Sequence, residues 1–145
     1  HAHAWIDEQL IVGDDLYLYY GGYARGHKVN RFEERQIGLV KTKRDRYVAR
    51  AASGVPGRIR TPRLLFDASA LTINAEAASG QIRVRVLSDD DRPAEGFDYS
   101  DSDPVAVDAL DAPVAWKRPL DALRDTPVRL EFEIRNARLY AFDLR

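Results

Sequence analysis

The fold is constrained most by residues 70–87, where apolar and polar side chains alternate on both sides of a turn signal. The apolar positions are Leu71, Ile73, Ala75, Ile82, Val84 and Val86. Polar or charged residues such as Asn74, Glu76 and Arg85 stand between them, and Ala-Ser-Gly at 78–80 separates the two runs. A period of two is typical of strands with one buried face. We therefore predict a half-buried antiparallel hairpin here.

The same alternation recurs further along the chain. Between 128 and 135, Val, Leu, Phe and Ile alternate with Arg and Glu, which predicts a strand with Glu131 and Glu133 on its polar side. A turn at 136–138 leads to a last strand at 139–144. Shorter strands are expected at 47–51, 57–61, 64–66, 105–107 and 113–117, and one helical turn at 120–124. Many short strands with almost no helix predict an all-β fold, an antiparallel β-sandwich of jelly-roll type.

The first 43 residues have a different pattern. A hairpin is expected at 9–20, with its turn at 13–15, and a third strand at 35–42, so that three strands form a meander. The middle strand is apolar on both faces, with Leu16 and Leu18 on one and Tyr17 and Tyr19 on the other. A strand without a polar side needs cover on both faces. We predict two domains, a β-meander at 1–43 and a β-sandwich at 44–145.

Composition excludes several classes of function. The chain has 145 residues, a formal net charge of -1 and no cysteine. Balanced charge disfavours nucleic acid and anionic membranes as partners, and no apolar run is long enough to span a bilayer. Disulfides, thiol nucleophiles and cysteine metal sites are impossible. The chain contains no methionine, even at position 1, which indicates a piece of a longer polypeptide.

The order of several short motifs carries a resemblance to a known group of enzymes. They run YYGGY, GH, RQIGLVKTKRDRYVA, LTINAEA, GQIRVRVL, GF, DSDPV, VAWK and PVRLEFEIRNARLYAF. This order resembles the C-terminal end of glycoside hydrolases with a five-bladed β-propeller, the family 32-like invertases and levanases and the family 43-like arabinanases and xylosidases. Residues 5–43 are similar to the end of the last propeller blade, and residues 45–145 to the β-sandwich that follows it.

The resemblance implies a non-catalytic role. In such enzymes the catalytic carboxylates lie on early and middle blades, and the NDPNG-like and RDP motifs of the invertase type do not occur in this sequence. We therefore expect an accessory β-sandwich that stabilises the catalytic propeller of its parent chain, with secretion or a periplasmic location implied. The alternative is a stand-alone carbohydrate-binding module. If isolated, the chain is expected to form homo-oligomers through its uncovered meander.

Five residues are candidates for contact with carbohydrate. His27, Arg31 and Arg35 belong to a basic loop that could reach a sugar, or that is simply solvated. Tyr23 belongs to an aromatic cluster that serves either sugar stacking or packing within the blade. Trp116 is a candidate stacking surface for a pyranose, but core packing beside its strand neighbours is the alternative.

Metal binding has weaker candidates, and no other cofactor is predicted. Asp98, Asp101 and Asp103 bring three carboxylates close together in sequence, and calcium prefers such hard oxygen ligands. Asx-turns that cap the loop before a proline are the alternative. The run Asp89 to Asp91 is expected to be a turn, and the terminal His1 and His3 a weak metal chelator or a flexible end.

Overall fold

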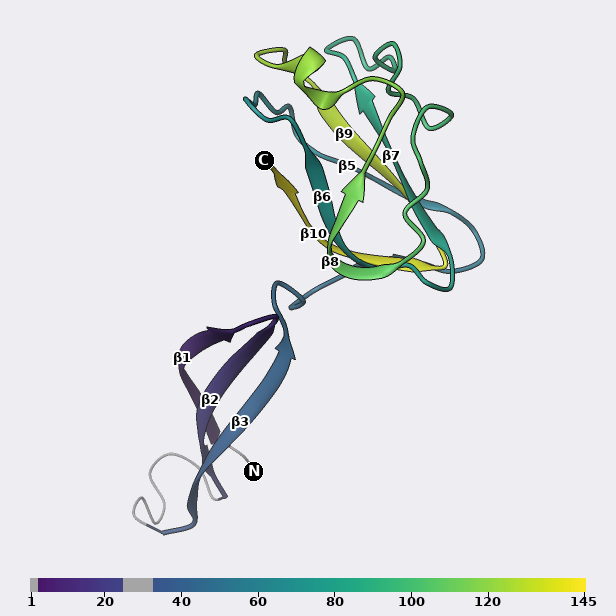
Figure 1. The fold of residues 1–145 in the computed structure, drawn as a ribbon. Helices are drawn as coiled ribbons and strands as arrows, with labels where there is room; N and C mark the ends of the chain where they lie inside the picture. Colours follow the sequence, from purple (N-terminus) through teal and green to yellow (C-terminus); the bar gives the residue numbers. More distant parts are fainter. Residues whose placement is uncertain (1–2, 25–32) are drawn as a thin grey trace. The chain divides into compact units, whose positions relative to one another are not determined.

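The computed structural model describes residues 3–24 and 33–145, and its fold is all-β, as predicted (Figure 1). The chain divides into two compact units, residues 1–45 and 46–145. The division therefore falls two residues after the predicted boundary at 43. No helix of the described residues is long and apolar enough to cross a membrane.

The first unit is a three-stranded antiparallel meander, as predicted. Its strands β1 (His3–Val12), β2 (Asp15–Tyr23) and β3 (Arg35–Lys43) lie in the order β1-β2-β3. A tight turn at residues 13–14 joins the first two, and Gly13 has a φ of 62°, which glycine adopts without strain. A bulge interrupts the register between Ile6 and Gln9.

The second unit is a β-sandwich of two antiparallel sheets. One contains β4 (Arg50–Ala52), β10 (Ala137–Leu144), β6 (Leu71–Glu76) and β8 (Asp108–Val114), in that order. The other has the order β5 (Gly57–Arg60), β9 (Arg129–Arg135), β7 (Gln81–Leu87). A short 3-10 helix, η1 (Leu120–Leu123), occupies the expected helical turn.

The predicted hairpin at 70–87 is wrong in its pairing, although both strands exist. β6 and β7 belong to different sheets, so the turn between them carries the chain across the sandwich. The connection from β9 to β10 does the same, and the two crossings pack together at Gly80. A Cβ at Gly80 would collide with the backbone oxygens of Arg135 and Asn136, so only glycine fits this approach.

The core lies between the two sheets. Ile73, Ile82, Val84 and Val86 are completely buried, as their alternation predicted. Asn74 was expected to be exposed on the polar side but is buried, and its side-chain oxygen accepts a hydrogen bond from Arg46, which also binds Glu76 on that side.

Four of the shorter predicted strands differ from the structure. The strand expected at 47–51 begins only at Arg50, as β4. Residues 64–66 and 105–107 each contribute only an isolated bridge. The strand expected at 113–117 lies earlier, as β8, and Trp116 forms a bridge with Ser102 beyond its end.

Candidate functional site

The predicted carbohydrate-contacting residues do not form one described site. His27 and Arg31 lie outside the described residues. Tyr23 and Arg35 pair directly across β2 and β3 in the meander, whereas Trp116 belongs to the sandwich. Of the three predicted residues that the structure describes, Tyr23 and Arg35 therefore come together and Trp116 does not join them.

A hollow of about 500 Å³ lies at the same end of the meander as this pair. Its lining includes Tyr20, Tyr23, Gln36 and Gly38. The Tyr20 ring lies against the backbone of Gly38, its cross-strand partner, in space that a Cβ at Gly38 would take. This hollow thus offers aromatic surface and an amide, the two kinds of group that contact sugars.

Trp116 packs against the core of the sandwich. Its Nε1–H donates a hydrogen bond to the Val84 carbonyl oxygen at 2.7 Å. The ring centroid lies 5.6 Å from that of Phe97, with the planes tilted by 59°. Since both the ring and its only polar atom are engaged by the protein, these contacts support the core-packing interpretation.

The carboxylates of Asp98, Asp101 and Asp103 do not converge on a metal site, and no group of three potential ligands is found in the described parts of the chain. Asp98 Oδ1 accepts from the Tyr99 amide at 2.8 Å. Asp101 binds Lys117 Nζ at 2.6 Å, which lowers the pKa of that carboxyl. The described contacts thus give no support to a calcium ligand set, and those of Asp98 and Asp101 hold the loop instead.

The most buried charged residue that the structure describes is Glu131 on β9, only 5% exposed. It was expected to face water, and it does lie on the outer face of its sheet. Arg60 from β5 and Arg85 from β7 cover it from both sides, with Nη2 to carboxylate distances of 2.8 and 2.6 Å. Tyr99 covers it from a loop and donates its hydroxyl at 3.0 Å.

The surroundings of Glu131 favour a charged carboxylate with a structural role, because its oxygens accept hydrogen bonds from the protein. Burial alone would raise its pKa, but hydrogen bonds from Arg60, Tyr99 and Arg85 together outweigh burial and lower it. For Tyr99, burial and then its bond to Glu131 raise the pKa of the phenol. A general acid needs a raised carboxyl pKa, and Glu131 has the opposite shift.

Changing Glu131 to glutamine should destabilise the fold in a pH-dependent way. Because the folded-state pKa lies below the ordinary 4.5, the carboxylate stabilises the fold above that value and loses its effect as pH falls through the folded pKa. We expect a loss of about 2 kcal/mol at neutral pH. The loss should shrink below about pH 4.

Denaturant unfolding of wild type and Glu131→Gln at several pH values measures this effect. Glu133→Gln is the matched control. Glu133 lies on the same strand and pairs with the exposed Arg58, and an exposed salt bridge contributes about 1 kcal/mol or less. An equal loss at acid and neutral pH for Glu131→Gln would show that its charge is irrelevant.

A second charged cluster surrounds Arg46, the first residue of the sandwich unit. Its Nε donates to Asn74 Oδ1 at 2.9 Å, and its Nη1 to Glu76 Oε1 at 2.8 Å. Its Nη2 donates to the Ala75 carbonyl at 3.1 Å, and the guanidinium lies 4.9 Å from the centroid of the Tyr140 ring. Through these contacts Arg46 fixes the chain to the sheet where the sandwich begins.

Arg46→Ala should lower the free energy of unfolding of the chain by about 2 kcal/mol, since it leaves buried acceptors without their charged donor. Arg92→Ala is the control, because Arg92 is 82% exposed and pairs only with an exposed aspartate, and about 0.5 kcal/mol or less is expected there. Thermal or denaturant unfolding of both variants measures the difference. Equal midpoints would contradict an anchoring role.

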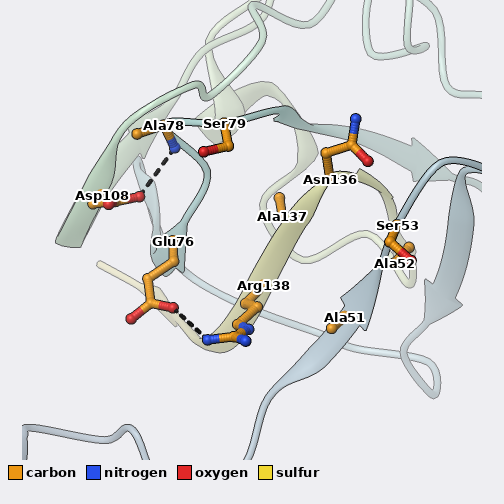
Figure 2. A pocket seen from close by; sticks show the side chains of 10 residues that line it. All are labelled: Ala51, Ala52, Ser53, Glu76, Ala78, Ser79, Asp108, Asn136, Ala137 and Arg138. Atoms are coloured by element: carbon orange, nitrogen blue, oxygen red, sulfur yellow. Dashed lines mark hydrogen bonds and ion pairs between the residues drawn. The ribbon is translucent and has the colours of Figure 1, made fainter.

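A pocket of about 610 Å³ lies at one end of the sheet that contains β6 and β10 (Figure 2). Two carboxylates line it, those of Glu76 and Asp108. Glu76 Oε2 lies 3.1 Å from Arg138 Nη1, and Asp108 Oδ1 accepts from the Ala78 amide at 3.0 Å. Because both carboxylates already have protein partners, the pocket is polar but does not present a free acid and base pair.

Comparison with known proteins identifies no family. A scan against protein-family models and searches of curated proteins and of solved structures give no significant match.

Proposed function

We propose that this chain is a non-catalytic β-sandwich accessory module of a glycoside hydrolase, and that its meander completes the last blade of a catalytic propeller. The observation that carries the proposal is the uncovered apolar surface of the meander. Of its described side chains only Leu16 is buried, whereas Ile6 is 68%, Ile11 66% and Ile37 85% exposed. Such a surface is typical of an element that packs against further protein.

The sandwich supports the same assignment, because its described residues form a hydrophobic core of their own. Its apolar side chains pack between its two sheets, and the outer face of the β5-β9-β7 sheet carries ion pairs such as Arg58 with Glu133. Its exposed large apolar residues lie in loops, at Tyr47, Val48, Val55, Leu65 and Val107. A self-sufficient sandwich joined to an incomplete sheet matches an accessory domain that follows a propeller.

The proposed role is tested in a propeller enzyme that carries this module. Ile37→Lys should lower the unfolding temperature of that enzyme, because the lysine would bring a charge into the apolar packing of the blade. Lys41→Ile, on the same strand at a charged and half-exposed position, serves as the control and should change it little. An unchanged unfolding temperature for Ile37→Lys would contradict packing of this face in a blade.

The isolated chain should release no reducing sugar from fructans, arabinans or xylans. The carboxylates of Glu131, Glu76 and Asp108 are held by protein donors, and glycoside hydrolysis needs a protonated acid paired with a second carboxylate across an open site. A reducing-sugar assay with protein free of contaminating enzyme measures this. Steady release that scales with the concentration of the chain would overturn the non-catalytic assignment.

The hollow beside Tyr20 and Tyr23 favours a second candidate function, carbohydrate binding. Affinity electrophoresis in gels that contain each polysaccharide separates the two candidates. A structural module migrates as in the blank gel, whereas a binding module is retarded, and Tyr23→Ala then abolishes the retardation.

A further inference from the structure

The β10 strand has an open edge over most of its length. On one side β10 pairs with β6 from Arg138 to Leu144, but on the other side it pairs with β4 only from Ala137 to Leu139. Among the described residues, no strand pairs with residues 140–144 on that side. Unpaired backbone N–H and C=O groups along a strand edge favour the addition of another extended chain.

An apolar pocket of about 400 Å³ lies along this edge, between the two sheets of the sandwich. Ile59 of β5, Phe132 of β9 and Phe142 of β10 contribute its apolar walls. The Phe132 and Phe142 ring centroids are 5.4 Å apart. A side chain from a strand added beside β10 would point into this pocket at alternate positions.

The segment that precedes β4 does not pair with the open edge of β10. Continued past Arg50, its register would set residues 47–49 opposite residues 140–142, but these residues are not in a strand. Arg46, which precedes them, is bound to Asn74 and Glu76 on β6, and its guanidinium lies over the Tyr140 ring of β10. Val48 lines the pocket and is 74% exposed.

The charges around the pocket indicate the chemistry of a partner. Its two charged lining residues are Arg50 and Arg60. Arg60 is neutralised by Glu131 and Asp91. Arg50 is exposed and has no ion pair with the residues that the structure describes. An exposed cation beside an apolar pocket complements a carboxylate next to an apolar side chain.

We propose that this edge binds an extended peptide segment of a partner protein by strand addition. The peptide backbone pairs with residues 140–144, one aliphatic or aromatic side chain enters the pocket, and an acidic residue next to it meets Arg50. Main-chain bonds supply affinity and the pocket supplies selectivity in this mode of recognition. The proposal concerns the sandwich alone and does not depend on the accessory role.

Selection from a random octapeptide phage library on the immobilised chain tests the proposal. The enriched peptides should carry an apolar residue flanked by Asp or Glu, and fluorescence anisotropy with the synthetic peptides gives their affinity. Ala141→Glu, which adds a charge to the open edge of β10 beside the pocket, should abolish binding. Val107→Glu, at an exposed loop position, is its control and should bind as wild type.

Arg50→Glu keeps the test decisive if Ala141→Glu fails to fold. It should weaken acidic peptides about tenfold or more, while Arg50→Lys changes their affinity little. Three outcomes would overturn the proposal: no enrichment over the naive library, binding that is unchanged in Arg50→Glu and in folded Ala141→Glu, or a dimer that Ala141→Glu disperses. The last result would assign the edge to a second copy of the chain.

Discussion

Replacing Trp116 with alanine is expected to lower the free energy of unfolding by about 3 kcal/mol or more. The substitution removes the ring contact with Phe97 and the bond to the Val84 carbonyl, and it opens a cavity next to fully buried Val84. Small domains have total stabilities of about 5–15 kcal/mol, so this loss removes a large share of the stability of the fold. Denaturant unfolding followed by far-UV circular dichroism measures the loss.

Trp116→Phe separates the two contributions of the side chain. It keeps much of the ring contact but removes the Nε1–H donor, so a loss of about 1 kcal/mol is expected. If Trp116→Ala unfolds with the wild-type midpoint but loses retention on a polysaccharide gel, the ring is a sugar-stacking surface instead. The two interpretations therefore give opposite patterns of stability and binding.

The sequence predicted which segments are strands better than it predicted their partners. Alternation marks a buried face, as at Ile82 and Val84, but it is identical in a hairpin and in a crossing between two sheets. The partner of β7 is β9, some 50 residues later in the chain, rather than the adjacent β6. The one residue that indicated the crossing is Gly80, because the backbone of Arg135 and Asn136 lies where a Cβ at this position would be.

The buried charges were missed for a related reason. Alternation correctly put Glu131 on the outer side of β9, but its burial results from Tyr99 and from arginines on two other strands. The sequence does contain a signal for these ion pairs: β5 and β7 carry arginines, and β9 carries glutamates that can pair with them across strands. It becomes interpretable only when the strand order β5-β9-β7 is known.

The isolated chain is expected to self-associate at micromolar concentration through its meander. Ile6 and Ile11 on β1 and Ile37 on β3 are exposed, and both of these are edge strands of the three-stranded sheet. Open edges beside apolar surface favour strand pairing or strand exchange between copies. Light scattering coupled to size exclusion should therefore give a dimer or a larger species.

Two variants locate the association. Ile11→Lys with Ile37→Lys should give a monomer, because charges on edge strands oppose pairing. Deletion of residues 1–45 should give a monomer that remains folded, since the sandwich core is complete within residues 46–145 and Arg46 keeps its partners there. A monomeric full chain, or a deletion that unfolds the remainder, would mean that the meander is part of the sandwich's own fold. In that case its apolar surface would no longer support assignment to a propeller blade.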